Sequence, residues 1–165
     1  MNRSSIMALG ALATLGLLSG AALADAPKAR EYATVSEQIH IDRSTEVVWR
    51  KVGGYCDIGA WLKTTCVYTT GSGGVGTNRL IAGKVDEVLV SRTATAYTYA
   101  QPMAENIYHG TVETLPDGTG AKIVYSLVYD VSALPDAAAK AGYNAQKTGF
   151  LKAMLATMKS LAEAP

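Results

Sequence analysis

The chain has 165 residues, and its 15 Lys and Arg side chains nearly balance its 14 Asp and Glu side chains, for a net charge of +1 at pH 7. A chain of this length is typical of one domain with a single core. Because the charges are balanced and form no basic stripe, neither nucleic acid nor an anionic membrane surface is an expected partner.

The N-terminal segment has the features of a secretory signal. Arg3 supplies a positive start, residues 6–18 form an uncharged apolar run, and Ala22-Leu23-Ala24 is a small-x-small cleavage site. The apolar run is short for a membrane span, and no second run of about 18 apolar residues follows. We therefore expect residues 1–24 to be cleaved, leaving one domain over residues 25–165, a periplasmic or secreted location and no stable membrane insertion. A retained N-terminal anchor is the alternative.

Both cysteines, Cys56 and Cys66, lie in the expected mature chain. In an oxidising compartment, two thiols of a small secreted domain most simply form a disulfide, and closing so short a loop contributes about 2–3 kcal/mol. A zinc site would need more ligands than these thiols and the scattered His40 and His109 provide. A catalytic thiol is the alternative, but no His or Asn pattern supports it. We expect a Cys56–Cys66 disulfide, no metal and no cofactor.

The mature chain begins with a strand and two short helices. Residues 32–41 are rich in alternating β-branched and aromatic side chains, which is typical of a strand. Ser44 is a helix N-cap, and Gly53-Gly54 ends the helix that it starts. Asp57 then begins a second helical turn that runs to Leu62.

Strands then follow one another without an intervening helix. The glycine-rich stretch of residues 71–76 and the Pro116-Asp117-Gly118 sequence are typical hairpin connections. Because the strands recur about every ten residues, they predict an antiparallel meander. The expected strands are residues 65–70, 77–82, 85–92, 93–100, 107–115 and 121–131.

One long helix is expected over residues 134–164. Pro135-Asp136 is a typical helix start, and no further proline occurs until Pro165. At about 1.5 Å per residue this helix is roughly 40 Å long, so it needs a broad apolar surface to lie on. Its expected buried face consists of Tyr143, Phe150, Leu151, Met154, Leu155, Met158 and Leu161.

The order of the elements predicts an α+β fold. We expect an antiparallel sheet of about 6–7 strands curved around the long C-terminal helix, with two short helices after the first strand. A sheet that curls around a helix cannot pack flush everywhere. A gap lined by sheet and helix is therefore expected.

Six short segments, taken in order, carry a resemblance to a known family. They are Glu46-Val47-Val48-Trp49, Asp57-Ile58-Gly59-Ala60-Trp61, Gly74-Val75-Gly76-Thr77-Asn78-Arg79-Leu80, Tyr97-Thr98-Tyr99, Tyr108-His109-Gly110-Thr111-Val112 and Gly120-Ala121-Lys122-Ile123-Val124-Tyr125. From about Tyr32 to Leu161 the chain resembles the helix-grip proteins of the START and birch-pollen-allergen (SRPBCC) superfamily, in its bacterial polyketide cyclase/dehydrase-type branch. Among secreted members it looks most like periplasmic accessory proteins associated with methanol oxidation.

The resemblance implies one domain that holds a hydrophobic or aromatic small molecule between the sheet and the long helix. It does not imply one chemistry, because the superfamily contains lipid carriers, hormone receptors, cyclases, dehydratases and aromatase subunits. Relatives often pair a glutamate on the third strand with an aspartate before the fourth. Here Glu87 is present, but Leu89-Val90-Ser91 precedes Arg92 without an acid, so that pair is not expected.

The spacing Gly71-x-Gly73-x-x-Gly76 formally matches a dinucleotide-binding fingerprint. That fingerprint needs a following helix, so that a helix N-terminus faces the pyrophosphate. Residues 77–81 are strand-like instead. No nucleotide is therefore expected at this turn.

Tyrosine is the most informative composition signal, with nine Tyr against one Phe. A ring with a polar tip suits a cavity that holds an apolar body and also forms hydrogen bonds to it. The alternative is that the tyrosines simply cover a sheet face. Tyr97 and Tyr99 point the same way, as do Tyr125 and Tyr129, which favours all four for the cavity. The expected ligand-binding residues are Tyr97, Tyr99, Tyr125, Tyr129, Tyr143, Phe150, Met154 and Arg79.

Catalytic candidates are fewer. His109 and Glu113 lie on one face of an expected strand and could act as acid and base. The more apolar side chains of that strand lie on its other face, however, which favours a solvated pair. Arg79 either binds a carboxylate or phenolate in the cavity or lies at the sheet surface. The candidate catalytic residues are His109, Glu87 and Arg79.

Three functions are consistent with the sequence. The first is a periplasmic or secreted carrier of a small hydrophobic or aromatic ligand. The second is a polyketide cyclase/dehydratase-type enzyme that uses His109 or a tyrosine as proton donor with Arg79 or Glu87 assisting, which predicts an ionisable side chain inside the cavity. The third is an accessory protein that contacts a periplasmic dehydrogenase, which predicts a filled pocket and an exposed apolar patch. The sequence alone does not decide whether the protein is an enzyme.

Overall fold

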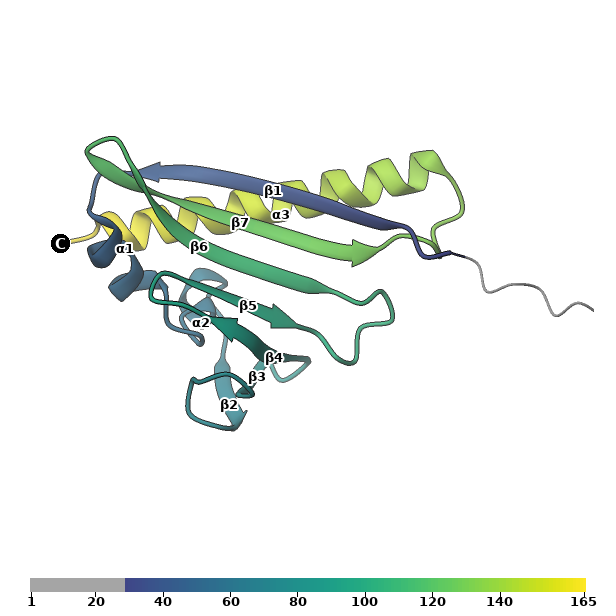
Figure 1. The fold of residues 1–165 in the computed structure, drawn as a ribbon, viewed down its shortest axis with the longest axis horizontal. Coiled ribbons are helices and arrows are strands. Elements are labelled where there is room, and N and C mark those ends of the chain that lie inside the picture. The colour runs from purple at the N-terminus through teal and green to yellow at the C-terminus, as the bar shows by residue number, and fades with distance from the viewer. Residues whose placement is uncertain (1–28) are drawn as a thin grey trace, which may run out of the picture.

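A computed structural model describes residues 29–165 of the chain (Figure 1). The expected signal over residues 1–24 lies outside the described residues. The elements are β1 (Tyr32–Ile41), α1 (Thr45–Val52), α2 (Ile58–Trp61), β2 (Cys66–Thr70), β3 (Asn78–Ile81), β4 (Val85–Arg92), β5 (Ala96–Ala100), β6 (His109–Asp117), β7 (Gly120–Asp130) and α3 (Ala137–Glu163).

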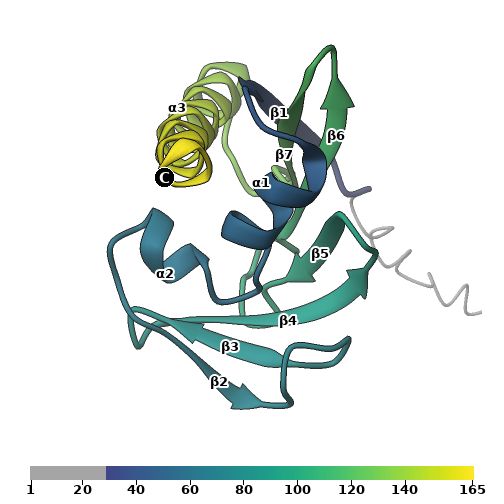
Figure 2. The ribbon, with the colours of Figure 1, turned by 90° about the vertical axis from the view of Figure 1, so that its left-hand side faces the viewer.

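The strands form one antiparallel sheet in the order β1-β7-β6-β5-β4-β3-β2, so β1 and β2 are its edges. Strands β2 to β7 follow one another as a meander, and β1 returns to pair with β7, from Tyr32 opposite Asp130 to Ile41 opposite Ala121. Seen end on, the sheet curves around the helices (Figure 2). The predicted α+β helix-grip fold, with a curved antiparallel sheet and a long C-terminal helix, is confirmed.

The inner face of the sheet forms the core together with α3. Alternation along β7 sends Ile123, Tyr125, Leu127 and Tyr129 inward, and all four are fully buried. The residues between them face outward and are partly or fully exposed. The period of two that the sequence shows in this strand therefore separates core from solvent.

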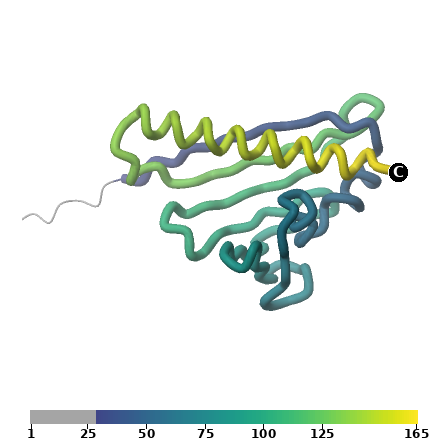
Figure 3. Tube along the Cα trace, turned by 180° about the vertical axis from the view of Figure 1, so that it is seen from behind, coloured from purple at the N-terminus to yellow at the C-terminus, as the bar shows by residue number. Residues whose placement is uncertain are grey.

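Helix α3 runs alongside β1 (Figure 3). The Asp136 side chain accepts a hydrogen bond from the Ala139 N–H at 2.8 Å and so caps its N-terminus. Its buried side chains are Leu151, Met154, Leu155, Met158 and Ala162. The prediction that Phe150 belongs to the buried face is wrong, because this ring is 42% exposed. Phe150 is rotated about 100° around the helix from Leu151 and so lies at the edge of the buried stripe.

The two short helices lie between α3 and the β2–β5 side of the sheet (Figure 2). Ser44 caps α1 by accepting a hydrogen bond from the Val47 N–H, as predicted. The predicted disulfide is also present: Cys56 and Cys66 are bonded, which ties the start of the α2 segment to the first residue of β2. In the part of the chain that the structure describes, no helix is long and apolar enough to cross a membrane.

Several predicted strand boundaries change by one to three residues. The strand expected from Thr93 begins only at Ala96, because the Thr93 N–H and the Ala96 carbonyl are hydrogen-bonded across the β4–β5 turn. Strand β6 continues through Pro116, where a turn was predicted, and the chain reverses at Gly118 with φ +60°. Pro116 lies beyond the last residue of β6 that pairs with β5, Glu113, so its missing N–H removes no ladder bond on that side.

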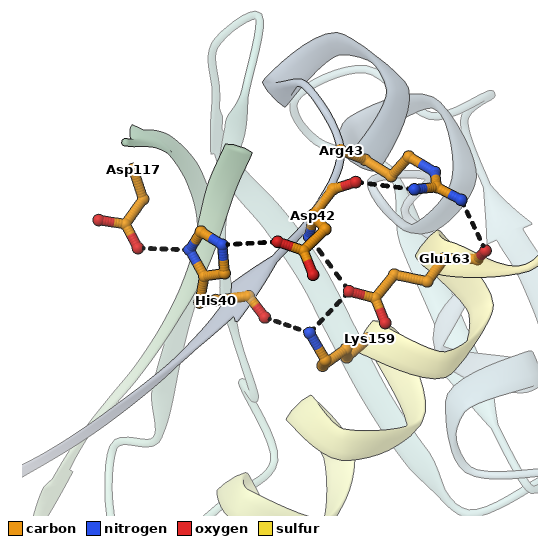
Figure 4. Close-up of polar contacts among 6 residues, drawn as sticks. All are labelled: His40, Asp42, Arg43, Asp117, Lys159 and Glu163. Atoms are coloured by element: carbon orange, nitrogen blue, oxygen red, sulfur yellow. Dashed lines mark hydrogen bonds and ion pairs between the residues drawn. The ribbon is translucent and has the colours of Figure 1, made fainter. Parts of the chain in front are cut away.

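A cluster of charged side chains fastens the C-terminal end of α3 to the end of β1 (Figure 4). Its members are His40, Asp42, Arg43, Asp117, Lys159 and Glu163. The His40 ring lies 2.7 Å from an Asp117 oxygen through Nδ1 and 3.1 Å from an Asp42 oxygen through Nε2. Lys159 donates a 2.7 Å hydrogen bond to the His40 carbonyl and a 2.6 Å bond to Glu163. Because both ring nitrogens face carboxylates, only the protonated imidazolium donates both hydrogen bonds.

This arrangement makes the stability of the protein depend on pH. Hydrogen bonds to Asp117 and then to Asp42 raise the pKa of His40 above its ordinary value of 6.5. The folded state therefore holds this proton more tightly than the unfolded state, so the stabilisation is fully present below pH 6.5 and is lost as the pH rises through the raised pKa. As the pH rises from 6.5 through the raised pKa of His40, we expect the urea concentration at the unfolding midpoint of the wild type to fall. The midpoint of the His40→Gln variant should change less over the same pH range. His109→Gln, the control, should keep the wild-type profile; a wild type with no fall would contradict the prediction.

Candidate functional site

A small cavity lies between the inner face of the sheet and the helices. Its volume is about 100 Å³. One water molecule occupies about 30 Å³ and ligand pockets commonly measure about 300–1,000 Å³, so this cavity has room for a few waters or one small chemical group. Its lining consists of Ile58, Leu62, Ile81, Val85, Glu87, Tyr99, Gln101, Tyr108, Tyr125 and Phe150.

A buried ion pair stands at the β3–β4 side of the cavity. Arg79 and Glu87 are opposite each other in the sheet, and their side chains are 0% and 3% exposed. Arg79 Nε donates to Glu87 Oε2 at 2.8 Å, and Nη2 donates to the same oxygen. Arg79 Nη1 donates to the Tyr55 carbonyl, while Glu87 Oε1 accepts a 2.9 Å bond from Gln101. Each charge is thus matched inside the protein, and the pair is neutral as a whole.

Aromatic rings surround the Arg79 guanidinium. Its Cζ lies 4.0 Å from the centre of the Tyr55 ring, 5.1 Å from that of Tyr99 and 5.7 Å from that of Tyr97. At these distances the ring faces attract the cation, most strongly where water is excluded. The rings therefore help to hold a charge that would otherwise be costly to bury.

The tyrosine hydroxyls of the cavity are protonated donors. Tyr99 and Tyr125 hydroxyl oxygens are 2.7 Å apart in a buried hydrogen bond. Burial raises the pKa of both phenols well above their ordinary value of 10 and raises the pKa of Tyr97 to about 12. Gly110 leaves the space for this arrangement, because a Cβ there would lie 2.3 Å from the Tyr99 ring. One hydroxyl of this pair donates to the other, so the pair can offer its remaining phenolic O–H to an oxygen acceptor.

The structure divides the predicted ligand-binding residues into separate groups. Tyr99, Tyr125 and Phe150 line the cavity together with the catalytic candidate Glu87. Arg79 and Tyr97 are buried behind this lining. Met154 lines a surface hollow between α2 and α3. Whether these residues bind a ligand stays a prediction.

Tyr129 and Tyr143 lie at a different place, near the N-terminal end of α3. The Tyr129 hydroxyl donates to Asn144 at 2.7 Å, and the Tyr143 hydroxyl accepts from Asn106 at 3.1 Å. Tyr143 lines a surface hollow of about 320 Å³ at this end. The Tyr129 ring contacts Tyr108, a tyrosine of the cavity lining, with ring centres 6.1 Å apart.

His109 does not line the cavity. It is half-buried on the outward face of β6, and its Nδ1 lies 3.2 Å from the Ile107 carbonyl oxygen. Glu113 is on the same outward face of this strand. Among the described residues, no group of three or more His, Cys, Asp and Glu side chains is arranged to hold a metal ion.

Gln101 is a site residue that the sequence analysis missed. It follows the end of β5, where it continues the inward alternation of Tyr97 and Tyr99 and reaches Glu87. Extending the predicted strand over residues 93–100 by one residue would have placed Gln101 on the same face as Tyr97 and Tyr99. Leu62, which also lines the cavity, lies at a turn and carries no such signal, whereas Val85 begins β4 and shares a face with Glu87, so the period of two does point to it.

The backbone is strained around this cavity. Lys63, Ala82 and Ile107 adopt positive φ angles of 51°, 52° and 49°, which side chains other than glycine rarely do. Each is next in sequence to a lining residue, namely Leu62, Ile81 and Tyr108. Such conformations cost about 1–3 kcal/mol each and gather at ligand sites. Lys63 itself also lines the hollow between α2 and α3, and Ile107 also follows Asn106 of the hollow beside Tyr143, so the strained residues border these hollows as well as the cavity.

Breaking the ion pair should be costly. Arg79→Met leaves the Glu87 charge buried without its cation, so we expect the free energy of unfolding to fall by about 3–5 kcal/mol in urea titrations. The double variant Arg79→Met/Glu87→Leu should recover part of this loss. The control is Lys152→Met, which removes a largely exposed lysine from its ion pair with Glu37, where Nζ and Oε1 are 3.8 Å apart, and it should change stability by less than about 1 kcal/mol. If Arg79→Met changed the free energy of unfolding as little as this control does, the claim that the Arg79–Glu87 pair is shielded from water would be contradicted.

Two tyrosine-to-phenylalanine variants should differ in sign. The Tyr97 hydroxyl is buried without a hydrogen-bond partner among the described residues, so Tyr97→Phe should leave stability unchanged or raise it. Tyr99→Phe removes the hydrogen bond to Tyr125 and should cost about 0.5–1.5 kcal/mol. Thermal unfolding of both variants at equal concentration makes the comparison. An equal loss in the two variants would be evidence against the unpartnered Tyr97 hydroxyl.

Comparison with known proteins agrees with this fold. Residues 32–163 match the family model of polyketide cyclase / dehydrase and lipid transport. Comparison with curated proteins gives no match.

Several solved structures are similar. A protein from Nitrosospira multiformis is 21% identical with a TM-score of 0.60, covering 80% of this chain and all of that one. Norcoclaurine synthase from Thalictrum flavum, in complex with dopamine and hydroxybenzaldehyde, is 18% identical with a TM-score of 0.59, covering 80% and 87%. The di-domain ARO/CYC protein BexL from the BE-7585A biosynthetic pathway is 15% identical with a TM-score of 0.64, covering 81% and 51%. These structures share the fold, and with the family match over most of its length the chain belongs to the polyketide cyclase/dehydrase branch of the SRPBCC superfamily.

Proposed function

We propose that the protein binds and carries a small hydrophobic or aromatic ligand between its sheet and α3, without chemistry of its own. The observation that carries this proposal is the cavity lining, in which apolar side chains and phenolic hydroxyls surround an internally neutralised ion pair. Such a lining suits an apolar body with one or two oxygen atoms.

The hydrogen bonds that Glu87 already accepts within the protein favour a carrier over an enzyme. Glu87 is the carboxylate of the cavity lining, and both of its oxygens accept hydrogen bonds, from Arg79 and from Gln101. A general base needs a free oxygen within reach of a substrate proton. Burial holds the cavity tyrosines in their protonated form, so they do not serve as bases, although they keep the proton that the enzyme alternative requires of a donor.

The relatives support the ligand class. The family description includes lipid transport, and norcoclaurine synthase from Thalictrum flavum has been solved with two aromatic molecules. The proposal also includes a periplasmic or secreted location. The Cys56–Cys66 disulfide and the sequence of residues 1–24 support that location.

An accessory role is the second candidate function. The β2–β3 hairpin presents exposed apolar side chains, with Val67, Tyr68 and Val75 exposed by 54%, 41% and 65%. Strand β2 is also a sheet edge, where unpaired backbone groups can take a partner strand. The small size of the cavity favours this candidate as well.

Purification of the mature protein from its own compartment, followed by mass spectrometry, tests the carrier role. We expect a stoichiometric apolar or aromatic compound, released chemically unchanged. Ile81→Phe adds bulk to the cavity wall and should lose the compound, while Val67→Phe on the exposed hairpin should retain it. A product found beside its precursor would identify an enzyme. An empty protein that retains a partner protein only when Val67 is intact would favour the accessory role.

A further inference from the structure

The size of the cavity sets a limit on the proposed ligand. About 100 Å³ is less than the roughly 150 Å³ of an apolar cavity known to hold one benzene ring. A ligand of ordinary size must therefore extend beyond the cavity. Three observations indicate where it extends and what chemical character it has.

The first observation is the position of Phe150. This ring borders the cavity and also two surface hollows, one of about 200 Å³ beside Gln146 and Lys147 and one of about 280 Å³ between α2 and α3. Leu62 is likewise shared by the cavity and the larger hollow. Phe150 and Leu62 thus form the partition between inside and outside. Because Phe150 is 42% exposed, its ring can rotate into solvent without disturbing the core.

The second observation is a difference in the kind of polar group on the two sides of this partition. The inner side offers Gln101 and the phenols of Tyr99 and Tyr125. The larger outer hollow is lined by the apolar side chains of Trp61, Ala153 and Met154 and also by Lys63 and Thr157. A molecule that passes the partition would find neutral hydrogen-bonding groups at its inner end and mostly apolar side chains along its outer part.

The third observation is the absence of a free charge at the inner end, among the residues described. Arg79 directs its donors to Glu87 and to the Tyr55 carbonyl, and both Glu87 oxygens are occupied. A ligand carboxylate would be buried without a cation, and a ligand ammonium without a carboxylate, which is costly in a low-dielectric interior. A hydroxyl or carbonyl oxygen would meet protonated phenols instead.

Building on the proposed function, we propose that the site takes an elongated, uncharged amphiphile. Its hydroxyl or carbonyl end lies in the inner cavity, and its apolar body passes Phe150 into the hollow between α2 and α3. Phe150 and Leu62 form the opening through which it passes. Ala153 borders only the outer part of this path, so the space beside it sets the maximum length of a ligand that the site can hold.

Isothermal titration calorimetry with the mature protein tests this proposal. The probes are phenol, 4-butylphenol, 4-octylphenol and the 4-octylbenzoate anion. We expect 4-octylphenol to bind at least tenfold more tightly than 4-butylphenol, because more methylene groups contact the outer hollow. The 4-octylbenzoate anion should bind at least tenfold more weakly than 4-octylphenol.

Two substitutions on the same helix separate a site effect from a folding effect. Ala153→Trp fills the outer hollow and should weaken 4-octylphenol at least tenfold while leaving phenol unchanged. Ala156→Trp, the matched control, changes an equally exposed helix position outside the hollow and should leave all affinities unchanged. Phe150→Ala should raise both the association and dissociation rates of 4-octylphenol at least fivefold in stopped-flow experiments.

The outcomes distinguish this inference from the function on which it rests. Alkylphenols that bind with an affinity independent of tail length, or equally well to the Ala153→Trp and Ala156→Trp variants, would overturn the elongated site but keep the ligand-binding function. Tight binding of 4-octylbenzoate would overturn the requirement for an uncharged ligand. If none of the phenols binds the wild type, the proposed elongated site is wrong, and mass spectrometry of the natively purified protein decides the carrier function separately.

Discussion

Two opposite charges buried between β3 and β4 set the conditions for the rest of the interior. An arginine and a glutamate removed from water must satisfy each other, because neither can be left unpaired at reasonable cost. Arg79 and Glu87 do so with help from Gln101, the Tyr55 carbonyl and three aromatic rings. The neighbouring side chains are thereby fixed in place. What remains beside them is an apolar space with neutral hydrogen-bonding groups, which is the space in which a ligand is proposed to bind.

The placement of α3 explains why this space occurs on one half of the sheet. The helix packs along β1 and against β7, so that half of the inner face is filled by Leu151, Leu155 and Met158. Over β3 to β5 the sheet is covered instead by the short helices (Figure 2), and buried tyrosines such as Tyr55, Tyr97 and Tyr99 fill this part of the core. Short elements and large rings cannot fill a curved surface as completely as a long helix does. The strained residues beside Leu62, Ile81 and Tyr108 mark the same half.

Much of the fold could be predicted from the sequence, because local patterns determine it. Alternating apolar residues identify the inward face of β7, and Ser44 and Asp136 mark the starts of two helices. Two cysteines in a chain with a secretory signal indicate a disulfide between them. The site was harder, because it depends on register and on position along each strand. Tyr125 and Tyr129 share a face, yet at about 3.3 Å per residue they are roughly 13 Å apart and serve different ends of the molecule. Similarly, a helical pattern could not tell that Phe150 lies at the rim of the buried stripe, since that depends on what the helix faces.

The aromatic rings also give the protein an optical property. Seven of its nine tyrosines form a chain of ring contacts from Tyr68 to Tyr143, and Trp49 joins that chain 5.9 Å from Tyr97. At these ring separations, excitation of the phenols can transfer to Trp49, which lies beside Tyr97. Trp61 lies on the wall of the hollow between α2 and α3. The two tryptophans are thus intrinsic fluorophores at two different places, one beside Tyr97 and one at the hollow between α2 and α3. Ligand binding at either place can therefore be followed by tryptophan fluorescence without an attached dye.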